Sequence, residues 1–257
     1  RTIVSNNMDA DIEIKNDTAM KEHKKDRKDI LDESIVTSIK DLDGVLEVHP
    51  VVFAEITVPW EPDFSDMWMK EFYEKWLTVP YSQEKEEYQN HPENFGSSLI
   101  GIDEQKFDFL NENLEQPINK EEFLSGKTCI IYRNGLDLSN SDLIGSKVTC
   151  ALHSDKQVTQ TFTIGGVTDE SYYTAILGYP PTIITSDQVV KNFANESITL
   201  KIGVKYTKEY DRNIEKEILK LLEANGKEKD LSWDSKIEEA DAKTASFDAD
   251  QGRDFVR

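Results

Sequence analysis

Residues 198 to 206 read ITLKIGVKY, and every second side chain from Ile198 to Tyr206 is apolar, with Thr, Lys or Gly between them. A period of two is that of a strand with one buried face. In the residues that follow, Thr207 can cap a helix and Gly226 can end it. Between them, apolar residues recur at one-turn spacing: Ile214, Ile218, Leu221 and Leu222. This stretch is therefore predicted to form a strand followed by an amphipathic helix.

A second unit of the same kind lies near the start of the chain. Apolar and acidic side chains alternate over residues 10–14, and a charged stretch then leads into a helix that Gly44 ends. Val45 to Val58 is a β-rich run. The apolar face of the helix is formed by Leu31, Ile35, Ile39 and Leu42. Because each unit has an apolar face too small to fold alone, we expect both helices to pack on one face of a sheet built from both ends of the chain.

The composition indicates a folded chain. Its 257 residues, 37% of them hydrophobic, are enough for one large or two small domains with a real core. The longest weakly charged stretch, Ser171 to Ser186, is broken by Pro180 and Pro181 and is shorter than the ~20 apolar residues of a spanning helix, so no transmembrane segment is predicted. The chain begins with Arg1 and shows no leader sequence, which favours a piece of a longer protein.

The charge balance is strongly acidic. Fifty Asp and Glu against 30 Lys and Arg give a net charge of −20. Such a surface repels nucleic-acid phosphates and anionic lipid headgroups, so no nucleic-acid partner is expected. The simplest interpretation of the charge is a well-solvated surface.

Aromatic residues are concentrated between Pro59 and Phe95, which hold nine of the 24 in the chain. Ser65 can cap a helix there, with Pro80 just beyond its end. Three aromatic residues stand four apart on one face of that helix: Trp68, Phe72 and Trp76. We favour burial over a gap in the core; the second interpretation is a contact surface for a partner or substrate. The polar residues 83–94 are predicted to form a mobile loop.

The residues after Gly96 are β-rich, with short helices predicted at 104–110 and 186–193. Strands are predicted at 99–102, 127–132, 147–152, 159–167 and 182–185, and one more at 233–237 near the end of the chain. The Gly165-Gly166 pair indicates a bulge or a tight bend. This middle section is expected to form a subdomain of its own.

No catalytic, metal or cofactor site stands out. Ser125 to Thr128 matches the end of a phosphate-binding loop, but Glu121 replaces the leading Gly and a strand follows where a helix is required. The four His residues are scattered without metal-ligand spacing. Cys129 and Cys150 fit two buried thiols as well as one bridge. We therefore predict no cofactor, no metal and no enzymatic activity.

Five segments, in order along the chain, resemble motifs of the extracytoplasmic domain of MacB-like, FtsX-family ABC transporter permeases. They are DLDGVLEVHP at 41–50, LIGID at 99–103, LSG and CII at 124–126 and 129–131, LIGSKV at 143–148 and FTIGGV at 162–167. The resemblance runs from about Asp9 to about Asn225, and the order and spacing of the motifs are more specific than any one of them. The aromatic-rich segment departs from the family pattern as an extra insertion.

This resemblance implies an α+β fold of two subdomains inserted between two membrane helices. The expected divisions are a porter-like βαβ module from residues 1–58 plus 198–257, an aromatic-rich helical insertion at 59–95, and a β-rich middle subdomain at 96–197. It also implies a cell membrane protein whose fragment lies on the extracytoplasmic face, which is extracellular in a Gram-positive-type cell. The implied partners are a cytoplasmic ABC ATPase, a second permease copy, and an extracytoplasmic adaptor or peptide substrate.

The function that follows is coupling of cytoplasmic ATP hydrolysis to export or release of a peptide, antimicrobial or lipoprotein. The alternatives are a secreted cell-wall hydrolase or an extracellular sensor or adhesion module. In the permease, both chain ends should leave from the same end of the molecule, and the first strand should share a sheet with Ile198 to Tyr206. Trp68, Phe72 and Trp76 are the candidate partner-contact residues.

Overall fold

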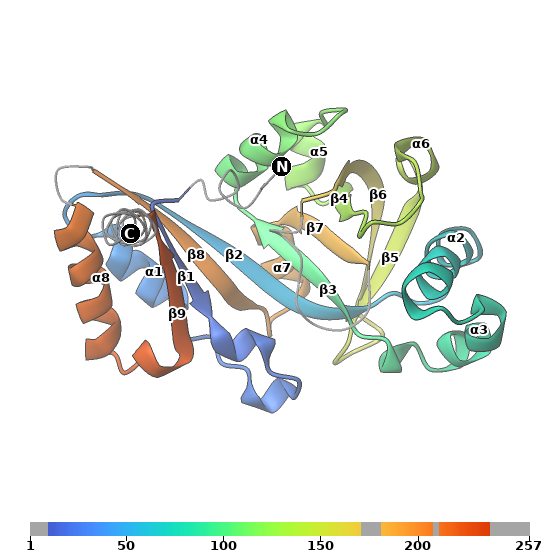
Figure 1. Cartoon of the computed structure of the whole chain (residues 1–257), viewed down its shortest axis with the longest axis horizontal. Helices are drawn as coiled ribbons and strands as arrows, with labels where there is room; N and C mark the ends of the chain where they lie inside the picture. Colours follow the sequence, from blue (N-terminus) through green and yellow to red (C-terminus); the bar gives the residue numbers. More distant parts are fainter. Residues whose placement is uncertain (1–9, 171–180, 208–210, 237–257) are drawn as a thin grey trace, which may run out of the picture. The chain divides into compact units, whose positions relative to one another are not determined.

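The computed structural model describes residues 10–170, 181–207 and 211–236, which form a mixed α+β fold (Figure 1). The strands are β1 (Ile12–Asn16), β2 (Val45–Thr57), β3 (Ser97–Ile102), β4 (Thr128–Tyr132), β5 (Lys147–Leu152), β6 (Thr159–Thr168), β7 (Thr182–Ser186), β8 (Ile198–Tyr206) and β9 (Leu231–Ser235). The helices are α1 (Glu33–Lys40), α2 (Pro62–Phe72), α3 (Tyr81–Asn90), α4 (Glu104–Glu112), α5 (Lys120–Leu124), α6 (Asn140–Leu143), α7 (Asp187–Phe193) and α8 (Asp211–Ala224). None of the helices in these ranges is long and apolar enough to cross a membrane.

The chain divides into two compact units. Unit 1 comprises residues 1–50 and 199–257, and unit 2 comprises residues 51–198. Unit 2 is thus inserted into unit 1 along the chain, and the first boundary falls inside β2. In this division the aromatic-rich segment belongs to unit 2. The expected three-part division of the chain, with its boundaries at 58, 95 and 197, stays a prediction.

Unit 1 is a sheet with two helices packed against it. Its strands follow the order β2, β8, β1, β9. β1 is antiparallel to both neighbours, with Ile14 opposite Ile202 of β8 and opposite Trp233 of β9. The prediction that the first strand shares a sheet with Ile198 to Tyr206 is therefore confirmed. The core joins one face of these strands to both helices, and it includes Ile12, Ile14, Ile35, Ile39, Ile202, Val204, Ile214, Ile218 and Leu222.

The two ends of the described chain meet at one place in unit 1. Ile12 at the start of β1 lies opposite Ser235 at the end of β9. Just beyond this pair, the backbone N–H of Lys236 donates to the carbonyl of Asp11 at 3.0 Å. The Lys236 Nζ also lies 3.9 Å from Oδ1 of the same aspartate. The chain therefore enters and leaves unit 1 through adjacent antiparallel strands.

In unit 2 the strand pairings close into a ring. β3 pairs with β7, β7 with β4, β4 with β6, β6 with β5, β5 with the second part of β2, and β2 with β3. The β3–β7 and β4–β6 pairs are parallel and the others are antiparallel. On β6, Ile164 pairs with Cys129 and Gly166 with Ile130, so Gly165 is the extra residue of a bulge. The bulge predicted from the Gly pair is confirmed.

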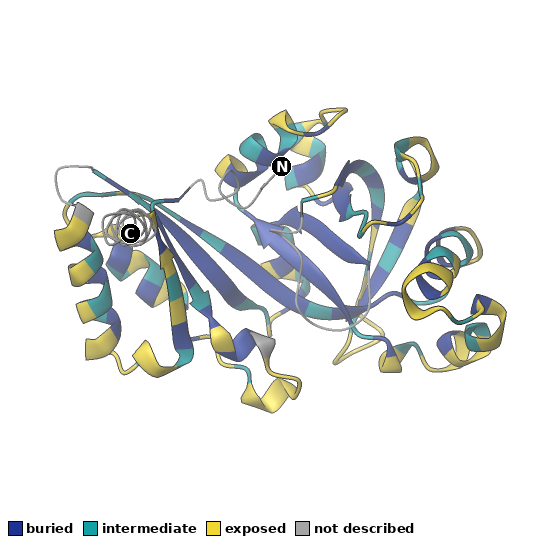
Figure 2. Cartoon of the chain, in the orientation of Figure 1, coloured by how far each residue is buried: buried dark blue, intermediate teal, exposed yellow. Residues whose placement is uncertain are grey.

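Unit 2 also holds helices around this ring, and Figure 2 shows buried residues on the strands with exposed residues on the outer sides of α2 and α3. Its core includes residues of α2 and α3 as well as the strands: Phe64, Trp68, Met69, Phe72, Tyr73, Tyr81, Tyr88, Leu99, Ile131, Val148 and Phe162. The aromatic segment therefore forms part of the unit 2 core.

Two sequence predictions about the helices are wrong. α2 begins at Pro62 rather than after Ser65, whose hydroxyl accepts the backbone N–H of Glu61 from within the first turn. Residues 83–94, predicted as a loop, lie mostly in α3, because Tyr81 and Tyr88 bury one side of an otherwise polar helix. The described part of α8 is Asp211–Ala224, and the predicted cap at Thr207 concerns the start of this helix at 208–210, which lies outside the described residues.

Candidate functional site

The end of the aromatic helix α2 has an unusual backbone. A π-turn, Tyr73–Leu77, follows α2 directly, and the N–H of Thr78 donates to the carbonyl of Tyr73, five residues back. Thr78 has a φ of 52°, which is uncommon for a β-branched residue. Single π-turns are rare and occur often at functional sites.

The π-turn decides which aromatic residues are buried. An α-helix turns once every 3.6 residues, so four residues bring a side chain back to nearly the same face. A turn of π-helix contains about one residue more than a turn of α-helix. Trp76, four residues after Phe72, therefore does not return to the face of Trp68 and Phe72. Trp68 is fully buried and Phe72 is 8% exposed, whereas Trp76 is 54% exposed. The prediction that the three share one face is wrong for Trp76.

The exposed indole is held by the loop between β4 and α6, residues 133–139, which we call the β4–α6 loop. The Trp76 Nε1–H donates to the carbonyl of Asn134 at 3.0 Å. The neighbouring Lys75 Nζ donates to the carbonyl of Gly135 at 2.5 Å and to Asp137 Oδ1 at 3.1 Å. Asn134 and Gly135 have φ values of 57° and 68°, which form a tight turn.

Gly135 allows this close approach. A Cβ on that residue would lie 3.2 Å from Cζ2 of Trp76, tighter than most real contacts. The backbone N–H of Asp137 in turn donates to Glu71 Oε1 of α2 at 3.2 Å. Five consecutive residues, 74 to 78, are exposed around the indole. The ring is therefore fixed in position while its surface remains accessible.

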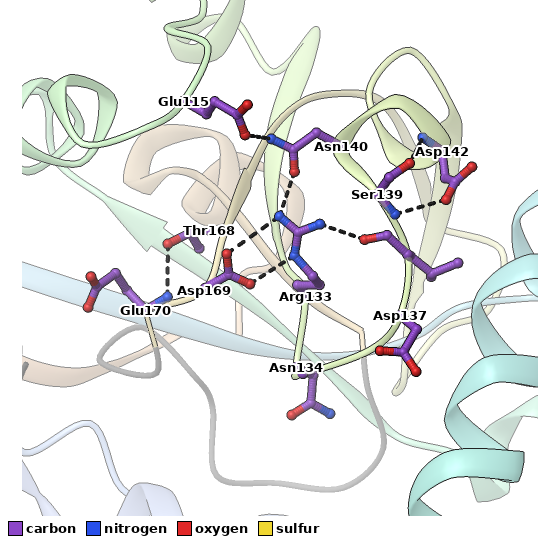
Figure 3. Close-up of polar contacts among 12 residues, drawn as sticks. Glu115, Arg133, Asn134, Asp137, Ser139, Asn140, Asp142, Thr168, Asp169 and Glu170 are labelled. Carbon is purple, nitrogen blue, oxygen red and sulfur yellow. Dashed lines mark hydrogen bonds and ion pairs between the residues drawn. The ribbon is translucent and has the colours of Figure 1, made fainter. Parts of the chain in front are cut away.

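Arg133 organises the inner side of the same loop (Figure 3). Its guanidinium donates to Asp169 Oδ1 at 2.8 Å, to the carbonyl of Leu138 at 2.5 Å and to Asn140 Oδ1 at 2.5 Å. Asn140 extends this network, because its Nδ2 donates a hydrogen bond to Glu115 Oε2 at 2.7 Å. The planar guanidinium of arginine has several N–H donors in fixed directions, so it can bind three separate acceptors at once. A lysine ammonium cannot reproduce this geometry. Arg133 thus ties the loop to the end of β6.

An open hollow of about 780 Å³ lies over this network. Six of its seven lining residues carry polar side chains, and the seventh is Ile144; the polar ones are Glu115, Gln116, Arg133, Ser139, Asn140 and Ser141. Ser139 begins α6 with a capping box, in which its hydroxyl accepts the N–H of Asp142 and the Asp142 carboxylate accepts the N–H of Ser139. This second hydrogen bond is the main cause that lowers the pKa of Asp142. The hollow therefore has a rigid rim.

A second network fixes the start of α2 against α3. Trp60 Nε1–H donates to the Tyr81 hydroxyl at 3.1 Å, and that hydroxyl donates to Asp66 Oδ1 at 3.1 Å. Lys85 pairs with the same carboxylate at 3.1 Å and lies 5.0 Å from the centre of the Trp60 ring. Burial raises the pKa of Tyr81 to about 12, so its hydroxyl stays protonated. Burial also pushes the pKa of Asp66 upward, but hydrogen bonds from Lys85 and Tyr81 outweigh this and lower it.

The two cysteines are free, buried thiols. β6 lies between β4, which carries Cys129, and β5, which carries Cys150. Neighbouring strands are ~4.8 Å apart, so these two strands are separated by about 9–10 Å, beyond the reach of a disulfide. Burial raises the pKa of Cys129 well above its usual range and that of Cys150 to about 12. Both thiols are therefore unreactive in the folded protein.

The remaining sequence motifs are placed as follows. Gly126 ends α5 with a φ of 82° and strand β4 follows, so this segment lacks the strand, loop and helix order of a phosphate-binding loop. Among the described residues, no group of three or more His, Cys, Asp or Glu is arranged to hold a metal ion. Arg133 was not among the predicted site residues. Only the turn signal Asn134-Gly135 directly after a predicted strand points to this loop from the sequence.

The chain is similar to solved structures of two extracytoplasmic regions. One is the periplasmic region of MacB from Actinobacillus actinomycetemcomitans, at 15% identity and a TM-score of 0.49, covering 96% of this chain and 98% of the other. Another is the extracellular domain of the noncanonic ABC-type transporter YknZ from Gram-positive bacteria, at 13% identity and a TM-score of 0.43, covering 79% and 88%. No protein-family model and no curated protein sequence matches the chain.

Proposed function

We propose that this chain is the extracytoplasmic domain of an ABC transporter permease of the MacB-like, FtsX-related kind. In this role it couples ATP hydrolysis by a cytoplasmic ATPase to the export or release of a peptide, antimicrobial or lipoprotein substrate. The chain itself carries no catalytic step. A second permease copy and an extracytoplasmic adaptor are further proposed partners.

The observation that carries this proposal is the meeting of the two described chain ends. An insertion between two adjacent membrane helices must leave the bilayer and return to it within a short distance. β1 and β9 meet this requirement, since Asp11 and Lys236 are hydrogen-bonded neighbours. The five family-like motifs between Asp41 and Val167 support the same conclusion.

Within this proposal the two units have different roles. Unit 1 holds both chain ends and is the membrane-proximal, porter-like module. Unit 2 is the insertion between Pro50 and Thr199, and we assign to it the contacts with extracytoplasmic partners. Of the three candidate contact residues, Trp68 and Phe72 are buried, and we retain Trp76 as the partner contact.

Labelling in intact cells tests the location. Both cysteines of this chain are buried, so the domain itself adds little background with a membrane-impermeant maleimide, and the unsubstituted full-length protein gives the reference level. We expect Lys156→Cys, at an exposed position between β5 and β6, to react in intact cells when placed in the full-length protein. The labelled protein should stay with the membrane pellet after an alkaline carbonate wash.

Two results would contradict the proposal. Reaction of Lys156→Cys only after lysis would place the domain in the cytoplasm. Release of the labelled protein into the medium would favour a secreted enzyme or sensor instead. A cysteine placed in the ATPase partner serves as the control, because it should react only after the cells are opened.

A further inference from the structure

An exposed apolar surface with an acidic rim surrounds Trp76. We define the Trp76 surface by its two exposed apolar side chains, Trp76 and Leu77, and by three carboxylates that lie on the same turn or bind to it, Glu71, Glu74 and Asp137. Leu77 is 39% exposed and the Asp137 side chain is 79% exposed. Within the described chain only four large hydrophobic residues are this exposed, and two of them are consecutive here.

The indole on this surface is immobilised before any partner arrives. Its N–H is bonded to the Asn134 carbonyl, and Lys75 fixes the adjacent backbone to Gly135. The left-handed Thr78 and the π-turn keep the ring turned outward at a cost in backbone strain, as is typical of binding and switch regions. A rigid aromatic side chain loses little conformational entropy on binding, which makes it an effective anchor.

The charge around the ring selects the partner. The Trp76 surface as defined has three carboxylates, and the adjacent Lys75, which pairs with Asp137, supplies one ammonium, so its net charge is negative. The imbalance extends over the whole unit, since residues 51–198 hold 24 Asp and Glu against 10 Lys and Arg. A Trp face attracts a cation through its quadrupole, and acidic neighbours strengthen that attraction and repel anions.

We propose that the Trp76 surface docks a peptide segment of a protein partner that carries Lys or Arg next to an apolar side chain. The cationic group lies over the Trp76 ring between the carboxylates of Glu74 and Asp137, and the apolar side chain contacts Leu77. This inference rests on the proposed function, because it assigns the chemistry of the extracytoplasmic partner that Trp76 contacts.

The test measures peptide binding to the 257-residue chain. The probe is a capped hexapeptide of four Lys and two Leu, compared with the analogue in which Glu replaces Lys. Binding is followed by the indole N–H resonance of Trp76, assigned by its disappearance in Trp76→Phe. We expect the Lys peptide to shift this resonance at concentrations up to about 1 mM, with an affinity that falls as salt is added, and the Glu peptide not to bind.

Matched variants separate this surface from general attraction by an acidic protein. Trp76→Ala should weaken binding roughly two- to fivefold, the value of a cation–π contact at an exposed site. Because this variant has no Trp76 indole signal, the affinities of the parent and of all variants are compared through the backbone amide resonances of the β4–α6 loop. Leu46→Ala, at another exposed apolar residue, should leave the affinity unchanged. Glu74→Lys should weaken binding of the Lys peptide relative to the parent. Glu228→Lys changes the net charge by the same amount but lies in unit 1, so it should leave the affinity nearly unchanged.

Three results would overturn the inference: no binding of the Lys peptide, equal binding of the Glu peptide, or equal weakening by Glu74→Lys and Glu228→Lys. None of them affects the proposed location of the domain, which the labelling of Lys156→Cys decides separately. Conversely, labelling only after lysis would remove the extracytoplasmic partner while leaving the peptide affinity as measured.

Discussion

Replacing Trp68 and Trp76 by alanine should give very different losses of stability, although the two residues share a spacing in the sequence. Trp68 is fully buried and stacks on Phe64 with ring centres 5.8 Å apart. Removing a ring that buries roughly 200 Å² from water costs about 3–5 kcal/mol once transfer and cavity terms are included. Trp76 is 54% exposed and makes one hydrogen bond, so its loss should cost about 1 kcal/mol or less.

The unpaired indole N–H of Trp68 adds a third variant to this test. Within the described chain Trp68 Nε1 has no hydrogen-bond partner, and a buried orphan donor costs about 1–3 kcal/mol. Trp68→Phe removes that donor while keeping most of the ring. Its free energy of unfolding should therefore fall by less than half of the loss seen for Trp68→Ala.

Urea unfolding followed by far-ultraviolet circular dichroism measures these differences without relying on tryptophan fluorescence. Trp68→Ala should also lower the melting temperature by about 6–20 °C, at 2–4 °C per kcal/mol for a unit of this size. The reasoning fails if Trp76→Ala is as destabilising as Trp68→Ala. It also fails if Trp68→Ala costs less than about 1 kcal/mol, because the ring would then not be part of the core.

Three further changes have definite expected outcomes. Gly101→Ala would place a Cβ 2.7 Å from the Asp187 Cα and 2.6 Å from Val52 Cγ2, so overpacking should lower the free energy of unfolding by about 1–3 kcal/mol in urea titrations. Arg133→Lys keeps the charge but loses the forked contacts to Asp169 and the loop, so the melting temperature should fall by several degrees, corresponding to about 2 kcal/mol. Burial raises the pKa of Asp187, so Asp187→Asn should gain stability relative to the parent as the pH rises from ~4 to 7 in thermal melts.

The sign of the Asp187 effect follows from linkage. Folding raises the pKa of this carboxyl, so its ionised form destabilises the folded state. This loss of stability is absent below the pKa of the carboxyl in the unfolded chain. It grows as the pH rises through the pKa of the carboxyl in the folded protein. A constant difference between Asp187→Asn and the parent across this range would contradict it. If Arg133→Lys has the same melting temperature as the parent, the Arg133 network does not contribute to stability. If Gly101→Ala has the same free energy of unfolding as the parent, β3 and α7 can separate freely.

All nine strands of the described chain were predicted from the sequence, some from alternation, as in Ile198 to Tyr206, and others from runs of β-forming residues. β3 and β7 belong to the second kind because they are buried on both faces. The sheet shared by Ile12 and Val204 followed from the same reasoning, since two small apolar faces need each other. Within α3 only Tyr81 and Tyr88 are buried, seven residues apart, which is too sparse a pattern to distinguish a helix from a polar loop.

The candidate site depended on geometry that local patterns do not contain. Whether the chain after Phe72 continues as an α-helix or widens into a π-turn depends on whether Tyr73 or Trp76 fits the core, and both are aromatic. Arg133 and Asp169 are 36 residues apart and meet only because β4 and β6 are neighbours. The aromatic enrichment was visible in the sequence and allowed two interpretations, burial in the core or a contact surface. Trp68 is buried, and Trp76 remains a proposed contact.

The neighbouring positions of Asp11 and Lys236 also determine how mechanical force would act on unit 1. Because Ile12 opposes Ser235, pulling the two connecting segments apart loads the β1–β9 pair one hydrogen bond at a time, beginning with the bond from Lys236 to Asp11. Such unzipping yields at a low force. A displacement that moves both connecting segments together places no load on this pair and carries the whole sheet with it. Unit 1 would therefore transmit joint movement of its two attachment points stiffly and yield when they separate.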